Sequence, residues 1–287
     1  MTIAQTFRSP CDFAHQMPNK IAEFLDIEKD LKRPFREDSI TDLILASMLK
    51  LPLGQVLILT PSEVRTGSDF DLVITQSDAR DAVHYRIQAK RLTLSRGPIW
   101  GNSYYRNINH RIKSTKALQV DVLCASRRCI PLYAFYNHGR IVRASANKIG
   151  GIALADAFII QKFVHGALPG LKRIGNLAAF FFPLTTILCS SEGKSMLATP
   201  RESELRVREA VAKTHEAMLK RPLTAELAAF HEPDQIAEEN GFDEALRTIV
   251  LNEVREGTAR ERRIISSPRV RRPCVTLIGP VEDSLGT

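Results

Sequence analysis

The sequence lacks the motifs that identify several classes of protein. Its five cysteines are odd in number and scattered, and none forms a Cys-x-x-Cys pair, so we expect a reduced, cytoplasmic protein rather than a zinc-binding one. No Gly-x-x-x-x-Gly-Lys loop occurs, which argues against ATP-driven chemistry. No Gly-x-Ser-x-Gly turn occurs either, which argues against a serine hydrolase.

The sequence also shows no pattern typical of a targeting signal or of a membrane-spanning segment. Residues Met1 to Ala22 are polar, are interrupted by Pro10 and Pro18, and show no basic-then-apolar order. The most apolar later stretch, Leu177 to Cys189, is too short to span a bilayer and contains Pro183. We therefore expect no secretion and no membrane partner, and we interpret the apolar stretch as buried core.

The charge is unevenly distributed along the chain. A net charge of +8 over 287 residues favours an anionic partner. Between Asp81 and Asp121 there is no acidic residue at all. The basic residues of this interval are Arg86, Lys90, Arg91, Arg96, Arg106, Arg111, Lys113 and Lys116. Trp100, Tyr104 and Tyr105 lie among them and can stack on bases, so the interval predicts a nucleic-acid contact; a plain solvated face is the alternative.

Two neighbouring apolar runs carry polar residues at the ends that a hairpin would bring together. The residues predicted to share a face are Asp69 and Asp71 on the first strand, and His84, Arg86, Gln88 and Lys90 on the second. If the strands pair through a turn at Gln76 to Asp81, Asp69 or Asp71 meets Gln88 and Lys90.

These residue types suit a metal-dependent phosphodiesterase. Mg²⁺ prefers oxygen ligands, which the carboxylate of Asp69 or Asp71 and the side-chain oxygen of Gln88 can provide. The backbone carbonyl of Ala89 is a further candidate ligand. Lys90 can orient or deprotonate water and stabilise charge that develops on the phosphate. The alternative is a strand whose Gln88 and Lys90 merely face solvent.

The same residues carry a family resemblance. Gly67-x-Asp69 followed by Gln88-Ala89-Lys90-Arg91 resembles the PD-(D/E)XK, or restriction-endonuclease-like, nuclease superfamily in its Gln-x-Lys form. The expected order of elements is a helix bearing Glu37, a strand at Gln55 to Thr60, the hairpin, a helix at Asn107 to Arg127 and a strand at Ile130 to Tyr136.

A narrower resemblance points to one bacterial family. Glu37-x-x-x-Thr41-Asp42, Gln88-Ala89-Lys90-Arg91, Gln119-x-x-x-Leu123 and Pro131-Leu132-Tyr133-Ala134-Phe135-Tyr136-Asn137 are similar to the domain of unknown function 6615. This similarity extends roughly from Ser39 to Cys189, with flanks.

The resemblance implies a fold and an activity. The fold is α/β, a restriction-endonuclease-like αβββαβ core with a mixed sheet flanked by helices. The activity is a Mg²⁺- or Mn²⁺-dependent endonuclease that acts on double-stranded DNA, as an effector of bacterial defence. The phosphate contacts would be Arg86, Arg91, Arg96, Arg106, Arg111, Lys113 and Lys116. The alternatives are a catalytically inactive nucleic-acid-binding module and a protein-scaffolding module on the same fold.

The resemblance also assigns roles to two residues outside the hairpin. Glu37 would contact the metal or its water; otherwise it is a helix N-terminal charge favoured by the helix dipole. Gln119 would lie near the site, and the alternative is a satisfied core amide. Gln88 stands where many relatives have Glu, which implies weaker metal binding.

Three parts are predicted along the chain. Residues 1–35 form an N-terminal extension, residues 36–190 the nuclease-like domain, and residues 191–287 a mostly helical C-terminal region with a basic tail. In the last part, Glu and Lys or Arg recur four residues apart, and a second helix is expected at Phe242 to Glu256. The arginine-rich tail at Arg260 to Arg272 is a candidate arm for nucleic acid. These helices can also support a homo-oligomer or a protein partner.

Overall fold

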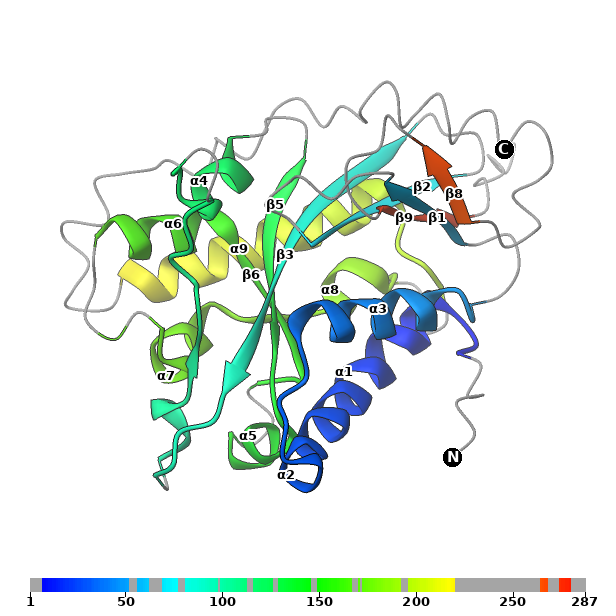
Figure 1. The fold of residues 1–287 in the computed structure, drawn as a ribbon. Helices are drawn as coiled ribbons and strands as arrows, with labels where there is room; N and C mark the ends of the chain where they lie inside the picture. The colour runs from blue at the N-terminus through cyan, green and yellow to red at the C-terminus, as the bar shows by residue number, and fades with distance from the viewer. Residues whose placement is uncertain are drawn as a thin grey trace, which may run out of the picture.

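A mixed β-sheet crosses the molecule and helices cover both of its faces (Figure 1). The structure is a computed structural model. It describes residues 7–51, 56–61, 69–76, 81–97, 99–112, 116–125, 129–145, 149–166, 170, 172–191, 196–219, 264–267 and 274–279.

The strands follow the order β7-β6-β5-β3-β2-β9-β1-β8, and β4 pairs with β3. Their bounds are β1 Val56–Pro61, β2 Phe70–Gln76, β3 Ala82–Thr93, β4 Tyr104–Tyr105, β5 Ile130–Tyr136, β6 Ile152–Asp156, β7 Phe182–Pro183, β8 Ile264–Ser267 and β9 Cys274–Gly279. Strands β2 and β3 form the antiparallel hairpin that the sequence predicts. Strand β5 then runs parallel to β3, after a connection that includes α4.

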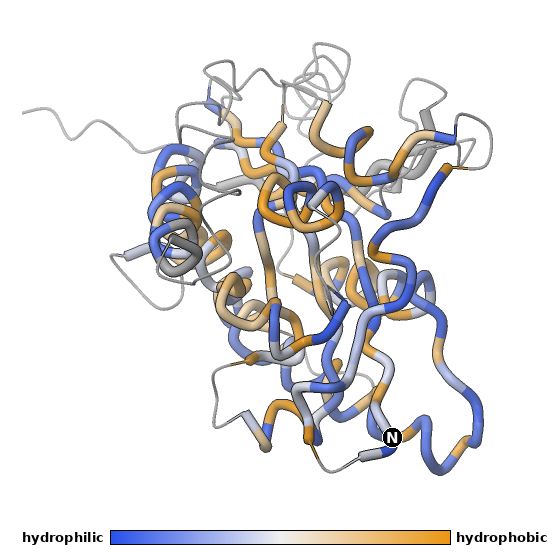
Figure 2. Tube along the Cα trace, turned by 90° about the vertical axis from the view of Figure 1, so that its left-hand side faces the viewer, coloured by the Kyte–Doolittle hydropathy of each residue, from blue (hydrophilic) through white to orange (hydrophobic). Residues whose placement is uncertain are grey.

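Helices pack on the two faces of this sheet. Their bounds are α1 Pro10–Asp26, α2 Glu28–Leu31, α3 Glu37–Met48, α4 Gln119–Cys124, α5 Gly139–Ala144, α6 Ala157–His165, α7 Ile174–Leu177, α8 Thr185–Leu188 and α9 Pro200–Leu219. One buried cluster joins α1, α3, α8 and α9 to Tyr85, Ile87 and Ala89 of β3. The other joins α4, α6 and α7 to Leu92 on the opposite face. Figure 2 shows hydrophobic residues concentrated on the strands and on the inner sides of the helices.

Helix α1 begins where its sequence predicts and packs closely on the rest of the fold. The side chain of Ser9 accepts a hydrogen bond from the backbone N–H of Asp12, and Pro10 occupies the first turn. At Gly151 a Cβ atom would lie 1.8 Å from the backbone oxygen of Pro18, so only glycine lets the two backbones approach this closely. Helix α1, which lies within the expected N-terminal extension, is therefore part of the core.

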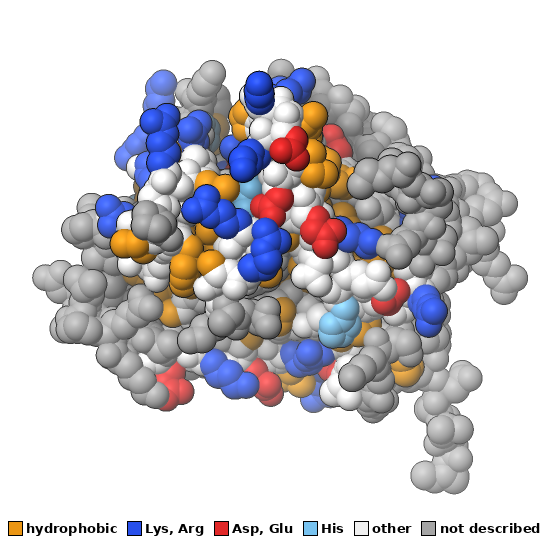
Figure 3. Space-filling model, turned by 90° about the horizontal axis from the view of Figure 1, so that it is seen from below, with side chains coloured by type: hydrophobic (Ala, Val, Ile, Leu, Met, Phe, Trp, Pro, Cys, Tyr) orange, Lys and Arg blue, Asp and Glu red, His pale blue; other side chains and the backbone are white. Residues whose placement is uncertain are grey.

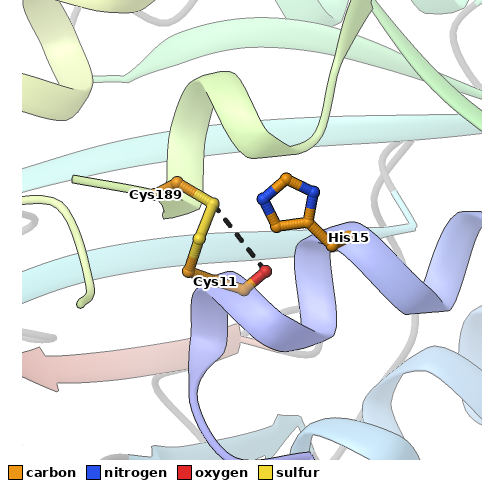
Figure 4. Close-up of side chains that lie close together, drawn as sticks. All are labelled: Cys11, His15 and Cys189. Atoms are coloured by element: carbon orange, nitrogen blue, oxygen red, sulfur yellow. Dashed lines mark hydrogen bonds between the residues drawn. A yellow bond between two sulfur atoms is a disulfide. The ribbon is translucent and has the colours of Figure 1, made fainter. Parts of the chain in front are cut away.

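A disulfide joins the N-terminal helix to the end of α8. Cys11 and Cys189, 178 residues apart, are bonded, and His15 lies beside them (Figure 4). The expectation of reduced cysteines is therefore wrong for this pair, because spacing rules read local sequence and this contact is made by the fold. The potential ligand atoms of Cys11, His15 and Cys189 lie within 4.8 Å of one another, but the disulfide occupies both sulfurs.

The helix expected at Asn107 to Arg127 is wrong over most of its length. Among the described residues of this segment, only Gln119–Cys124 is helical. Asn107 and Lys116 have φ angles of 55° and 60°, in the left-handed region that an α-helix does not use. Arg111 and Leu118 form an isolated bridge that folds the segment back on itself.

The C-terminal region contributes strands as well as the expected helix. Strand β9 lies between β1 and β2, so β1 is not a direct neighbour of the β2–β3 hairpin. Strands β8 and β9 lie after the expected domain boundary at 190/191, yet they pair with β1 and β2 in the same sheet. The helix predicted at Phe242 to Glu256 lies outside the described residues, as does most of the tail Arg260 to Arg272.

Candidate active site

The β2–β3 hairpin brings Asp69 next to Gln88, as the alternation of polar residues predicts. Phe70 pairs with Ile87, so Asp69, one residue earlier, lies beside Gln88. The Oδ2 atom of Asp69 accepts hydrogen bonds from Gln88 Nε2 at 2.7 Å and from the backbone N–H of Ala89 at 2.6 Å. Both contacts hold the carboxylate at the end of the hairpin.

Glu37 and Lys90 complete this group of residues. Glu37 is the first residue of α3, where the helix dipole favours an acidic side chain. Its Oε2 atom accepts a hydrogen bond from the backbone N–H of Arg91 at 2.7 Å, and its Oε1 atom lies 3.9 Å from Lys90 Nζ. Lys90 Nζ also donates to Gln119 Oε1 at 3.4 Å. A helix N-terminus and a hairpin end therefore meet around one lysine. We call Asp69, Gln88, Lys90 and Glu37 the hairpin site.

Burial changes the chemistry of Asp69. Desolvation raises the pKa of its carboxyl to about 6, and the nearby Glu37 and Asp38 act in the same direction. Lys90 and the Ala89 N–H lower this pKa but do not cancel the burial. A bound cation would therefore stabilise the charged carboxylate, because it compensates for the lost hydration.

Two buried oxygen atoms at the hairpin site have no hydrogen-bond partner among the described residues. They are Gln88 Oε1 and the hydroxyl of Tyr133. Gln88 and Tyr133 are register partners on β3 and β5, so both side chains leave the sheet on the same face. An unpaired acceptor beside a desolvated carboxylate suits an oxygen-seeking cation such as Mg²⁺.

The second aspartate has partners of its own. Asp71 Oδ2 lies 2.9 Å from His84 Nε2, and its Oδ1 atom lies 3.6 Å from Arg86 Nε. Asp71 pairs with Arg86, on the same face as Asp69 but two residue pairs further along the hairpin, and His84 pairs with Val73. Of the two alternatives left by the sequence, Asp69 is the carboxylate that contacts Gln88 and Ala89.

The predicted basic residues fall into two groups. Arg96, Arg106, Arg111 and Lys116 are exposed. Arg86 instead lies beside Asp71, and Arg91 Nη1 donates to both oxygens of Glu28 at 2.9 Å. Lys113 lies outside the described residues.

The expectation that Tyr105 contacts nucleic acid is wrong. It is fully buried, and its hydroxyl donates to Asn137 Oδ1 at 2.6 Å. Stacking on a base is therefore excluded for this tyrosine, because its ring packs in the core against Phe135. Tyr104 and Trp100 are partly exposed.

Two residues near the hairpin site were not singled out from the sequence. Tyr133 could have been found by counting residues along the strands, because it pairs with Gln88 between β3 and β5 and its side chain therefore leaves the sheet on the same face. Glu28 pairs with Arg91 across 63 residues, and no local pattern indicates that contact.

The fold and this group of side chains define a mixed α/β protein with a buried carboxylate–amide–lysine cluster at a hairpin end. The chain belongs to the family of unknown function DUF6615, which matches residues 10–271. Comparisons with curated proteins and with solved structures gave no match. Among the residues that the structure describes, no helix combines the length and apolarity needed to cross a membrane.

Proposed function

We propose that the protein is a metal-dependent nuclease of the PD-(D/E)XK class that hydrolyses phosphodiester bonds of DNA. The observation that carries the proposal is the convergence of Asp69, Gln88 and Lys90 at one hairpin end, with Glu37 beside them. The parallel strand β5, reached after α4, agrees with the core expected for this class.

The donor set fits a hard divalent cation. Asp69 would hold Mg²⁺ or Mn²⁺ through its carboxylate and Gln88 through its unpaired Oε1. The Ala89 carbonyl, which now accepts a 3.2 Å hydrogen bond from Gln88 Nε2, and Glu37 are the remaining candidate ligands. When bound, the metal supplies Lewis-acid activation of the phosphate and of the attacking water.

Lys90 supplies positive charge at the reacting phosphate. Its side chain is only 4% exposed and lies between Glu37 and Gln119, which fix its Nζ atom. A fixed cation in a desolvated site stabilises developing negative charge without reorganising at the moment of reaction. Lys90 also lies where it can orient the attacking water.

The exposed arginines and lysine give the substrate a path. Arg96, Arg106, Arg111 and Lys116 are proposed to contact phosphates, and their effect should be independent of sequence. A cytoplasmic location and a role against foreign DNA are parts of the proposal that rest on the family resemblance.

One observation favours a second function. Gln88 carries no charge, so the hairpin site has one acid fewer than a site with Glu at this position. A protein that kept the fold and the basic surface but held no metal would be a nucleic-acid-binding module. Such a module would bind DNA in a salt-dependent way and leave it intact.

The test compares cleavage with binding. Supercoiled plasmid, linear duplex, single-stranded DNA and RNA are incubated with Mg²⁺, Mn²⁺ or EDTA, using wild type, Lys90→Ala and Lys213→Ala. Lys213 is exposed on α9 and serves as the matched control. We expect metal-dependent cleavage of DNA that Lys90→Ala abolishes while most DNA binding remains. Metal-independent binding without cleavage by the wild type would favour the binding module, and unchanged cleavage by Lys90→Ala would remove the hairpin site from the chemistry.

A further inference from the structure

A basic pocket lies at the opposite end of β3 from the β2–β3 turn. Its volume is about 640 Å³, and it is lined by the end of α1, by α2 and the segment after it, by the last residues of β3, and by α5. Figure 3 views the molecule from below and shows Lys and Arg side chains gathered on this side, with a few acids among them. We call this cavity the α2–α5 pocket.

The pocket has a large excess of positive charge. Among the described residues, seven lysines and arginines line it, against two acids. Each acid is already engaged by an arginine: Glu28 by Arg91, with two contacts of 2.9 Å, and Asp26 by Arg143 at 2.9 Å. Five cationic side chains are left that neither acid neutralises. Their mutual repulsion is relieved when an anion enters.

The floor of the pocket is built from buried groups. His138 is 3% exposed, and its ring nitrogens lie 3.8 Å from Asp26 and from Glu28. At the next residue, Gly139, a Cβ atom would be 2.6 Å from Asp26 Oδ2. Glu28, Arg91 and His138 are therefore held in place by burial, whereas Arg143 is 70% exposed, and the buried groups preorganise this part of the pocket for a ligand.

The cations come from separate elements that face one cavity. Lys29 lies on α2, Lys32 and Arg33 follow it, and Arg140 lies on α5. The fifth cation is Arg106, which follows β4 and which the proposed DNA path also includes. Convergent cations suit a ligand with several negative charges close together, because each phosphate can be shared among them. The volume is within the range of pockets for ligands of nucleotide size. Pro34 and Leu94 add apolar lining where a base can lie.

We propose that the α2–α5 pocket binds a free small molecule with at least two linked phosphates, of the nucleoside polyphosphate class. The pocket is separate from the hairpin site: consecutive residues of β3 point to opposite faces, so Lys90 serves the hairpin site and Arg91 the pocket. This assignment does not depend on cleavage of DNA at the hairpin site.

Binding is measured by calorimetry on the full chain, with ATP and with inorganic pyrophosphate, in EDTA at about 0.1 M salt. The test variant is Lys29→Glu/Arg33→Glu/Arg140→Glu, and a second, milder variant replaces the same three residues by Gln. All three side chains are exposed, so the fold should tolerate the changes. The matched control is Arg201→Glu/Lys213→Glu, which alters exposed cations on α9.

We expect saturable binding by the wild type and the control, and at least a roughly tenfold weaker Kd in both pocket variants. If the wild type binds neither ATP nor pyrophosphate, the proposal is overturned. It is also overturned if the control variant loses as much affinity for the probes as the pocket variants do. A further arm adds a short duplex oligonucleotide. If the pocket variants weaken binding of the duplex while neither ATP nor pyrophosphate binds the wild type, the pocket belongs to the nucleic-acid surface and the small-ligand assignment is wrong.

Discussion

Replacing Asp69 by Asn should stabilise the metal-free protein while it removes metal binding. Asn keeps the shape of the side chain and an oxygen that can accept from Gln88 Nε2 and from the Ala89 N–H. It removes a carboxylate whose charged form is disfavoured by burial. The folded protein should therefore lose an unfavourable buried charge.

The size of the effect follows from the pKa difference. The carboxyl has a pKa of about 6 in the folded protein against 3.8 for a fully hydrated aspartate, so charging it costs the folded state roughly 3 kcal/mol relative to the unfolded chain. Because the folded pKa is the higher one, the cost is absent below the unfolded pKa and grows as pH rises through the folded pKa. The stability gain of the Asn variant should rise from near zero below about pH 4 to at most about 3 kcal/mol above about pH 7.

Urea unfolding in EDTA at several pH values measures this gain. Asp71→Asn is the matched control, since that aspartate is paired with His84 and Arg86 and its loss should destabilise by roughly 3 kcal/mol. Adding Mg²⁺ at about a hundred times its Kd should stabilise the wild type by about 2.7 kcal/mol and leave Asp69→Asn unchanged. A pH-independent loss of stability in Asp69→Asn would refute the reasoning about a desolvated carboxylate.

Three further changes test the core and the lysine environment. Cys11→Ser/Cys189→Ser should lower the free energy of unfolding by up to about 5 kcal/mol in non-reducing buffer, because the disulfide spans 178 residues; equal stability of variant and wild type would contradict the bond. Gly151→Ala should destabilise by about 3 kcal/mol or more in thermal unfolding, because its Cβ would overlap the backbone of α1, whereas Gly97→Ala, with its nearest atom at 3.9 Å, should have little effect. Gln119→Leu should reduce kcat of DNA cleavage roughly tenfold with little change in DNA affinity, since it removes a hydrogen bond to a charged group; an unchanged kcat would return this glutamine to a structural role.

The hairpin and the strand at Ile130–Tyr136 were predictable from the sequence because their signals are local. Period-2 alternation fixes which side chains share a face, and a short polar turn fixes the pairing. The helix that bears Glu37 was expected from the family resemblance, and Glu37 is the first residue of that helix. The alternation does not give the register of β2 against β3. That register determines which of the two aspartates, Asp69 or Asp71, lies beside Gln88.

The failures have a common physical origin in contacts between distant segments. The segment after Asn107 has helical spacing of apolar residues, yet a bridge and left-handed residues fold it back. Strand β9 is a short apolar run, and periodicity alone does not show that it inserts between β1 and β2. The disulfide belongs to the same class of contact.

The alternation of side chains along β3 also places Lys90 and Arg91, which belong to one motif in the sequence, on opposite faces of the sheet. Lys90 and Arg91 are adjacent, so their side chains must leave the strand on opposite faces. Lys90 reaches Glu37 and Gln119, while Arg91 reaches Glu28 in the wall of the α2–α5 pocket. The backbone N–H of Arg91 nevertheless donates to Glu37, so one peptide unit joins the two surfaces. A ligand that displaced Arg91 in the pocket would therefore act directly on the glutamate that positions Lys90.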